Sequence, residues 1–463
     1  MRLNLKQSNV LDRMSTDMNA AEPARAILGE SPLTATESGC GVRVISTDAE
    51  FDELETAWSK LLDESDATVF QSFEWSRTWW KYYAKPNQEL DILVFTIDNK
   101  IVAIAPLFKE VIGLPGMRLF SRLQFLGRGL SDYGDIIIRD GYEQPVLTSL
   151  VLHLRATAKG WDVFDIEDVN ESSPVMKHLQ GIMDQHGLNM YLYQGNVCPQ
   201  IQLSASESSS PTNSYNFRRK LKKLKQNFTV EVELLRSDTE DLRSAIDAFA
   251  AVHGNRWKSQ GYWSAFDDER NKAFHAEVAK RFACRNWLRL YFLKVDSIAV
   301  AASFHFNYNK RIYMYQSNVH GTEAVMKCSP GYLIRTLSIA DGIKEGMQVF
   351  DFLRGDEPYK YTEGNAVDSR NYLMRCSSPA LSGKIRFAMY LGYELLVKSR
   401  ERIGREYYEY RKFTLSKKRS QGDKALYVWR KIADIGVLGY NFIVRHLPAR
   451  SLQKFQIGRR SRQ

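Results

Sequence analysis

The sequence contains no apolar run of about 18 residues, the length that a transmembrane helix needs. We therefore expect no membrane-spanning segment. Residues 1–30 also lack the apolar stretch of a secretory signal, so secretion is not expected. The five cysteines are odd in number and widely spaced, which favours a reducing cytoplasm over an oxidising compartment.

Patterns for metal binding and for nucleophilic triads are missing as well. No pair of cysteines has CxxC spacing, and no cluster of Cys and His has the spacing of a metal site. The sequence therefore predicts no bound metal. None of the eight histidines pairs with a Ser or Cys in a recognised motif, so no catalytic triad is predicted.

Positive charge is concentrated at one end of the chain. The net charge is +10, yet residues 411–463 hold 14 Lys and Arg against two Asp and Glu. The rest of the chain holds 50 against 52 and is nearly neutral. A basic tail of this kind can bind nucleic acid or an anionic membrane, or it can serve solubility alone. The composition leaves these alternatives open.

Two stretches of the chain follow the same order of predicted elements. The first opens with strands around "DNK" at Asp98 and the second with strands around "DS" at Asp296, and a strand, a helix and an apolar strand follow each hairpin. The closing segments "LRATAKGWDVFDIEDV" and "IADGIKEGMQVFDFLRG" align, which makes Asp165 and Asp351 equivalent. The pattern predicts a duplicated α/β unit of roughly a hundred residues or slightly more.

Composition and periodicity divide the chain into predicted parts. "SFEWSRTWWKYYA" predicts a helix capped by Ser72, and "YNFRRKLKKLKQNF" predicts a basic amphipathic helix. The predicted parts are a disordered N-terminal segment (1–40), a first α/β unit (41–203), a Ser-rich linker (204–214), a second α/β unit with the basic helix (215–378) and a basic helical C-terminal extension (379–463). The predicted fold class is α/β with mixed sheets in a tandem duplication.

Several motifs in order carry a resemblance to a known family. They are "FQSFEWSRTWWKYY", "SDYGD", "NFRRKLKKLKQ", "SPGYLIRTLSIADGIKEG" and "FDFLRGDEPYKY". A hairpin, strand, helix and strand form the core order of the GNAT acyltransferase fold, and a duplicated unit resembles the FemABX-like group. The motifs themselves resemble the CelD-like acetyltransferases, a bacterial GNAT branch associated with cellulose and exopolysaccharide biosynthesis. The resemblance covers roughly residues 42–375 and implies a tandem GNAT fold.

The resemblance implies a site for acetyl-CoA, or another acyl-CoA, in the second unit. The helix start "KCSPGYLI" offers N–H groups and a partial positive charge to a phosphate, with Lys327, Ser329 and Gly331 beside it. The alternative is an ordinary capped helix. The usual GNAT pyrophosphate loop is replaced here by "AVMKCSPGYLIRTL", which has one glycine. In the GNAT fold two strands next to this helix splay apart around the acyl chain, which implies a groove lined by Tyr315 and Ser317.

The segment "VFDFLRGDEPYKY" supplies the predicted catalytic groups. A buried Asp351 without a partner would have a raised pKa and could act as a base, with Glu357 as a second candidate. An ion pair between Asp351 and Arg354 is the structural alternative. Tyr359 could act as an acid, and Lys360 or Arg354 could bind a phosphate or an oxyanion. The first copy continues as "DVNESSP", so the residues that only the second copy has favour Tyr359 and Lys360 over Asp351.

The Gly-rich turn "GRGLSDYGD" of the first copy supplies the predicted acceptor-binding residues. These are Arg128, Asp132, Tyr133 and Asp135. Clefts between domains are common ligand sites, so this turn could face the donor held by the second unit. A polar β-turn without a ligand is the alternative.

The resemblance implies an acyl-CoA-dependent acyltransferase that acts on a sugar or amino-sugar intermediate of an exopolysaccharide or envelope glycan. Two alternatives remain. One is a Fem-like aminoacyl or peptidyl transferase whose basic segments contact aminoacyl-tRNA. The other is a non-catalytic scaffold of a membrane-bound synthase complex, held at the membrane by the tail. The expected location is the cytoplasm, at the inner face of the membrane if the tail binds lipid.

Overall fold

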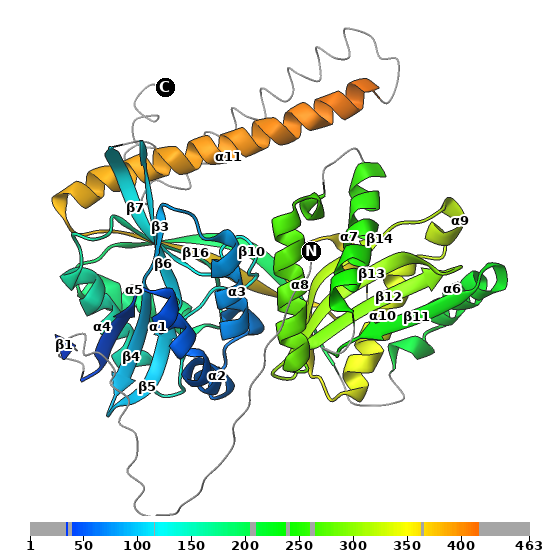
Figure 1. Cartoon of the computed structure of the whole chain (residues 1–463), viewed down its shortest axis with the longest axis horizontal. Coiled ribbons are helices and arrows are strands. Elements are labelled where there is room, and N and C mark those ends of the chain that lie inside the picture. Colours follow the sequence, from blue (N-terminus) through cyan, green and yellow to red (C-terminus); the bar gives the residue numbers. More distant parts are fainter. Residues whose placement is uncertain are drawn as a thin grey trace, which may run out of the picture.

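The computed structural model describes residues 34–35, 39–114, 116–203, 210–237, 241–259, 264–362 and 365–415. Nearly all of the predicted disordered segment, most of the linker and the tail beyond residue 415 lie outside these ranges. Figure 1 shows two lobes, the first drawn blue to cyan and the second green to yellow, with one long helix running above them.

The first lobe comprises β1 (Thr34–Ala35), β2 (Gly41–Ile45), α1 (Asp48–Glu53), α2 (Glu55–Asp63), η1 (Val69–Gln71), α3 (Phe73–Tyr83), β3 (Gln88–Leu90), β4 (Ile92–Ile97), β5 (Lys100–Ala105), β6 (Leu107–Leu114), β7 (Met117–Phe125), β8 (Ile137–Ile138), α4 (Glu143–Ala156), β9 (Val163–Asn170), α5 (Pro174–Gln185) and β10 (Met190–Gln202). The second comprises η3 (Pro211–Asn213), α6 (Tyr215–Asn227), β11 (Val230–Leu235), α7 (Leu242–Ser259), η4 (Ala265–Asp267), α8 (Glu269–Cys284), β12 (Leu288–Val295), β13 (Ile298–Tyr308), β14 (Arg311–Val319), α9 (Glu323–Met326), α10 (Pro330–Lys344), β15 (Val349–Asp351), η5 (Pro358–Tyr361) and β16 (Val367–Ser377). The long helix is α11 (Leu381–Leu415).

The structure confirms the predicted hairpin turns and the predicted start of α3. Both predicted hairpin turns have two residues in the left-handed region, with φ of 48° and 59° at Asp98-Asn99 and of 49° and 67° at Asp296-Ser297. This conformation matches the twist of paired strands. Helix α3 starts where Ser72 accepts a hydrogen bond from the Trp75 backbone, as predicted.

Each strand of the first hairpin is interrupted, and its two halves join different sheets. Pro106 interrupts the predicted strand "IVAIAPLFKE" because proline has no N–H to donate to a sheet. As a result β5 joins a five-stranded sheet in the order β1-β2-β4-β5-β8, while β6 joins the large sheet. The break at Asp91 separates β3 from β4 in the same way.

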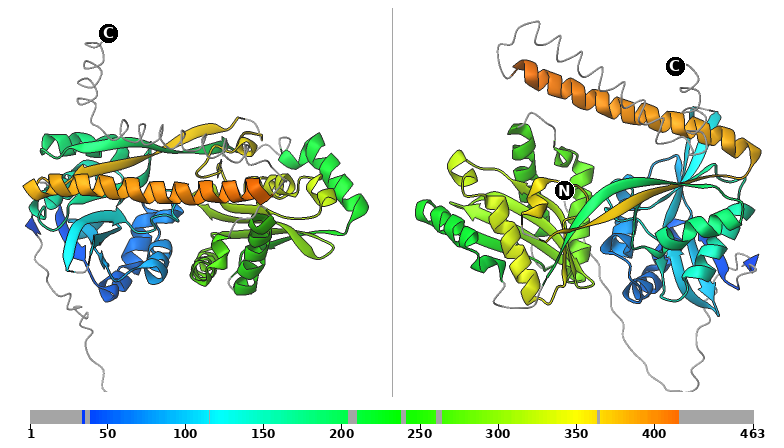
Figure 2. Two further views of the ribbon diagram at one scale, coloured as in Figure 1. Left: turned by 90° about the horizontal axis from the view of Figure 1, so that it is seen from above. Right: turned by 180° about the vertical axis from the view of Figure 1, so that it is seen from behind.

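One 11-stranded sheet runs through both lobes in the order β11-β12-β13-β14-β15-β10-β16-β9-β7-β6-β3. Strand β10, the last of the first unit, pairs with β15 of the second. Strand β16, the last of the second unit, lies between β10 and β9. The two units therefore exchange their final strands, and Figure 2 shows these strands crossing from lobe to lobe. The predicted mixed α/β fold of two like units is confirmed.

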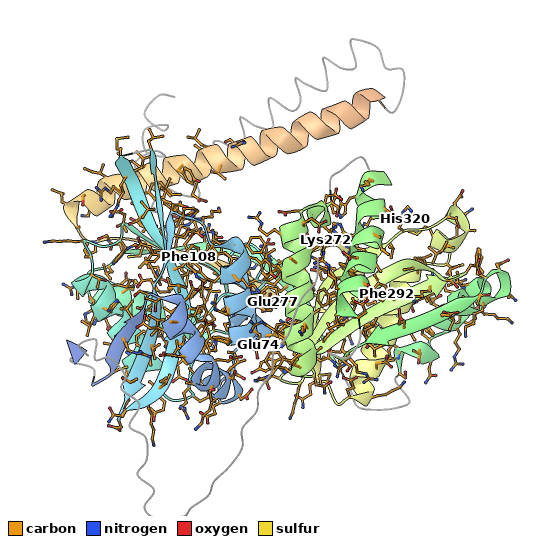
Figure 3. The ribbon with its side chains drawn as sticks, in the orientation of Figure 1. Glu74, Phe108, Lys272, Glu277, Phe292 and His320 are labelled. Atoms are coloured by element: carbon orange, nitrogen blue, oxygen red, sulfur yellow. The ribbon has the colours of Figure 1, made fainter. Side chains whose placement is uncertain are left out.

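Helices α3 and α8 form a second contact between the lobes. Trp75 of α3 packs edge-on against Phe274 and stacks with Phe282, both of α8. At the rim, Glu277 of α8 accepts a hydrogen bond from the Tyr82 hydroxyl and pairs with Lys81. Figure 3 shows Glu277 on the side of α8 that faces α3. The aromatic contact fixes the lobes relative to one another.

Helix α11 packs with one face on the first lobe. Phe387 and Tyr390 are buried with Phe120 of β7 and Val163 of β9. Glu394 of the same face pairs with the buried Arg122. Among the described helices, none is both long and apolar enough to cross a bilayer.

Candidate functional site

Each unit contains one pair of parallel strands, and the two pairs carry equivalent polar residues. In the first unit Arg122 of β7 is opposite Val163 of β9, and Asp165 follows two residues later. In the second, Arg311 of β14 is opposite Val349 of β15, with Asp351 in the matching place. The predicted equivalence of the two aspartates therefore holds in space.

Asp165 lies in a closed cluster of arginines. Its carboxylate is 2.9 Å from Arg375 of β16 and 2.9 Å from Arg128, while Arg122 lies 3.8 Å away. Burial alone would raise its pKa, but the three guanidinium groups outweigh burial and hold the pKa well below its usual range. Arg128, a predicted acceptor ligand, also pairs with Glu167 at 3.1 Å. In this structure Arg128 is thus part of the interior of the first unit.

Asp351 has a different set of neighbours. It accepts hydrogen bonds from the Tyr133 hydroxyl at 2.8 Å, from the Gln200 amide at 3.1 Å and from the Leu353 backbone at 2.8 Å. One arginine, Arg311, lies 3.3 Å away. Burial raises the pKa of Asp351 to about 6, although Arg311, the Leu353 N–H and Tyr133 oppose the shift. A group that titrates near neutral pH suits proton transfer.

The exchanged strands create this difference. Arg375 of β16 stands opposite Asp165, whereas the neutral Gln200 of β10 stands opposite Asp351. A guanidinium group favours an ionised neighbour strongly, and an amide does so only weakly. Leu353, next to the site, has φ of 57°, which is rare for a bulky residue and is found where local structure is held under strain.

A cavity of about 660 Å³ opens beside Asp351 between the two units. Tyr133 and Tyr313 line it together with five carboxyl groups and three cations, which are Asp66, Asp135, Asp140, Glu143, Asp351, Lys177, Lys310 and Arg311. Burial raises the pKa of Asp135 to about 7, against hydrogen bonds from Ser173 and the Ile136 backbone. Two carboxyl groups that titrate near neutral pH therefore face one polar cavity.

The strands of the second unit separate directly beyond Asp351. The last paired rung joins Tyr313 to Asp351, and β14 continues to Val319 without β15 beside it. Opposite β13 the register shifts between Phe304 and His305, which leaves Tyr315 as the extra residue of a bulge. Bulges are common next to active sites because they redirect side chains.

Unsatisfied polar atoms lie just after this bulge. Within the described residues, Gln316 Oε1 and Asn318 Nδ2 are buried without a hydrogen-bond partner. Such atoms are costly unless a ligand or water meets them. Arg256 of α7 donates to the Ser317 backbone carbonyl at 3.5 Å. Tyr315 packs into the aromatic core against Trp75 and Phe306, so the predicted groove contact of its ring is not seen.

The start of α10 lies beside the separated strand. A Cβ atom at Gly331 would come within 2.9 Å of Val319, so glycine allows this close approach. Ser329 stands at the N-cap with φ of 55°, but its side chain makes no capping hydrogen bond and instead accepts one from Lys220 at 2.7 Å. Lys327 is exposed and pairs with Glu323 at 2.8 Å. The cation that reaches this helix start is Lys220 of α6.

The segment after Asp351 folds into a turn tied to both units. Arg354 pairs with Asp132 at 2.5 Å and with Asp168 at 3.0 Å, both in the first unit. Lys360 is buried and donates to the backbone carbonyls of Leu353, Arg354 and Gly355. The donors of Arg354 and Lys360 thus make structural contacts inside the protein, and the contacts with a phosphate or an oxyanion stay predictions.

Tyr359 and Glu357 border this turn. The Tyr359 ring is 40% exposed and lies 5.2 Å from the guanidinium group of Arg335 in α10. Burial and then Glu357 raise the pKa of Tyr359 to about 12, with Arg335 opposing. The phenol therefore keeps its proton at neutral pH and can donate it. Glu357 forms an ion pair with Lys360 at 3.0 Å.

The structure brings Asp351, Tyr133 and Asp135 to one cavity and places Tyr359 on the turn that follows β15. It does not bring Arg128 or Lys327 to either place. Sequence reasoning missed Gln200 and Lys220, which reach the site from elements far away in the chain. Only Lys220 had a sequence signal, since it lies in the basic helix near the linker.

The described part of the chain offers no set of ligands for a metal ion. There, no group of three or more His, Cys, Asp or Glu side chains is placed to hold a metal ion. All five cysteines lie within the described ranges, and none of them forms a disulfide bond.

Residues 212–361 match the family model described as an acetyltransferase (GNAT) domain. This GNAT domain runs from the residues before α6 to η5, so it includes the separated strands, the start of α10 and the turn with Lys360. The second unit is therefore a GNAT acyltransferase domain, and the first unit repeats its pair of parallel strands. A search of curated proteins finds no match.

Solved structures similar to this chain include FemX, at 10% identity and a TM-score of 0.49, with 71% of this chain and 96% of that chain covered. A tandem GNAT protein from the clavulanic acid biosynthesis pathway is 11% identical, with a TM-score of 0.42 and coverage of 73% and 99%. L-PGS from Bacillus licheniformis is 12% identical, with a TM-score of 0.42 and coverage of 73% and 94%.

Proposed function

We propose that this acyltransferase takes its acyl group from acetyl-CoA, or another acyl-CoA, held by the second unit and transfers it to an acceptor bound between the units. The observation that carries the proposal is the contact between Tyr133 and Asp351. A carboxyl group with a pKa near 6 meets a phenol from the other unit, at the wall of a polar cavity and at the point where β14 and β15 separate.

The second unit fits an acyl-CoA in three respects. The free edge of β14 can pair with an extended amide chain, as strand edges do with peptides. Gln316 and Asn318 offer buried polar atoms that need partners. The start of α10, with Lys220 beside it, suits phosphate. When bound, an acyl-CoA would supply an activated acyl thioester.

The protein's own groups would then handle the protons. Asp351, ionised above pH 6, would accept the proton of the acceptor's amine or hydroxyl as that group attacks. Tyr133 would orient the carboxylate through its 2.8 Å hydrogen bond. Tyr359, which remains protonated at neutral pH, would be the donor to the departing sulfur.

We propose a sugar or amino-sugar intermediate of exopolysaccharide or envelope glycan synthesis as the acceptor. The support is the polar, carboxylate-rich lining of the cavity together with the resemblance of the motifs to CelD-like acetyltransferases. Carboxylates bind hydroxyl and ammonium groups well. The basic tail would keep the enzyme near an anionic membrane face, where such glycans are assembled.

The test is a free-thiol assay with acetyl-CoA and a panel of amino sugars. Asp351→Asn is expected to lower kcat by about 100-fold or more and to remove the fall in rate below pH 6. Tyr133→Phe should lower kcat less, because the carboxylate remains. Glu323→Gln, at an exposed position on α9, is the control. An Asp351→Asn enzyme with full activity and an unchanged pH profile would refute the assignment.

A Fem-like transfer from aminoacyl-tRNA is the second candidate, favoured by the surface of α6. That helix exposes a row of cations, which are Arg218, Arg219, Lys222, Lys223 and Lys225. Cations of this kind bind nucleic-acid phosphates in a strongly salt-dependent way. A gel-shift assay that finds no tRNA binding at low salt would remove this candidate.

A further inference from the structure

Helix α11 has two unlike faces. Its inner face is buried on the first lobe through Phe387 and Tyr390. Its outer face carries four large apolar side chains that are exposed to water: Leu381 at 84%, Ile385 at 61%, Met389 at 47% and Leu396 at 71%. Their spacing of four, four and seven residues places them on one side of the helix. We call these four residues the outer stripe.

The tip of the β6–β7 hairpin adds to the same side of the molecule. Leu114 and Met117 at this tip are 62% and 52% exposed. Arg118 of the hairpin and Arg386 of α11 both pair with Asp162, at 2.6 and 3.2 Å, which fastens hairpin and helix together. Figures 1 and 2 show the hairpin reaching the level of α11 beside its first turns.

Where the structure describes the side chains of α11, the exposed charge is positive. Lys384 and Arg400 are exposed on α11. Of the α11 side chains that the structure describes, one is acidic, and this residue, Glu394, is buried in its pair with Arg122. The chain that follows the helix, residues 416–463, holds 12 Lys and Arg against two Asp. The partner of this face is therefore expected to be anionic.

We propose that the outer stripe and the hairpin tip dock on an anionic membrane surface. The stripe runs from Leu381 to Leu396, about 22 Å of helix, so it offers a long ridge of the kind that lies in a lipid interface. Exposed apolar side chains insert between headgroups, while flanking cations and the basic tail meet acidic phosphates. This inference uses none of the catalytic residues, and it rests on and extends the membrane contact of the basic tail in the proposed function.

The experiment measures sedimentation of the full-length protein with vesicles of phosphatidylcholine, with or without phosphatidylglycerol. The test variant is Ile385→Glu with Leu396→Glu. Both side chains are exposed, so the melting temperature should not change. The control is Ile298→Glu, an equally apolar position that is 68% exposed at the β12–β13 turn. We expect wild type and control to bind only the anionic vesicles, and the double variant to bind them at least about tenfold more weakly.

Four results would overturn the proposal. The double variant could bind anionic vesicles as well as wild type does, or wild type could bind neutral vesicles equally. Light scattering could instead show a wild-type dimer that the double variant converts to a monomer, which would make a second copy the partner. Hydrogen exchange across α11 that rises when the chain is cut after Leu415 would identify the tail as the cover.

Discussion

At the scale of single residues, the residue opposite an aspartate in the neighbouring strand affects the pKa of the aspartate and so its ability to accept a proton. Asp165 and Asp351 follow the same Val-Phe sequence and each has an equivalent arginine, yet their pKa values move in opposite directions. Sequence reasoning could establish their equivalence but favoured Tyr359 and Lys360 for function. It could not see Gln200 and Arg375, because strand pairing over such distances leaves no local signal.

Gln200→Glu should therefore shift the acid limb of the rate profile. A second carboxylate about 3 Å from Asp351 would also compete for Arg311, and both effects raise the pKa of Asp351. We expect the midpoint of kcat to move up by about one pH unit. The measurement is a kcat profile between pH 5 and 9. A midpoint that moves down, or stays, would contradict this electrostatic account.

Asp135 allows a prediction on stability. Its folded pKa of about 7 lies above the value of 3.8 for a free Asp, so its contribution to stability is complete below about pH 4 and is lost as the pH rises through 7. Asp135→Asn removes this loss. We expect the melting temperature of the variant to exceed that of wild type by several degrees at pH 8 and by little at pH 4. Asp140→Asn, at an exposed position just after β8, should show no such trend.

At the scale of elements, structure that depends on a few neighbouring residues could be predicted from the sequence. Structure that depends on pairing with distant strands could not. The turns at Asp98-Asn99 and Asp296-Ser297 have a chemistry that selects one turn type. The basic helix was readable from its apolar stripe. The break at Pro106 was visible in the sequence, but which sheet each half joins depends on strands elsewhere.

Lys360, in the η5 turn, was predicted to be catalytic, but the contacts that the structure shows for it are structural. Lys360→Met would leave three backbone carbonyls without their donor, at about 1–3 kcal/mol for each buried group. We expect a melting temperature lower by about 5 °C or more, with weaker acetyl-CoA binding. Thermal unfolding of the variant decides the matter. A lysine that is only catalytic would lose turnover while the melting temperature stays the same.

At the scale of the whole molecule, the exchange of β10 and β16 makes the two units depend on each other. Arg354 adds ion pairs to Asp132 and Asp168 across the boundary, and α3 packs against α8. The predicted boundary within residues 204–214 marks a change in sequence composition. It does not separate two closed sheets, since each unit finishes the sheet of the other.

Separate halves should therefore fail to fold. Residues 210–415 alone would leave β15 and β16 without β10, and residues 39–203 alone would leave β9 without β16. We expect neither fragment to show a cooperative thermal transition and the co-expressed pair to regain one. Circular dichroism on heating provides the measurement. A lone 210–415 fragment that melts cooperatively and binds acetyl-CoA would show that the exchange is dispensable.

The place of β16 in the sheet also determines when the first unit can complete its fold during synthesis. A ribosome makes β9 and β10 early, but β16, the strand that belongs between them, follows only at Val367–Ser377. Until then the nascent first unit carries open strand edges, which attract other chains. The chain must therefore be made as far as Ser377 before its first unit can close, and we expect chaperones that shield unfinished sheets to raise its yield.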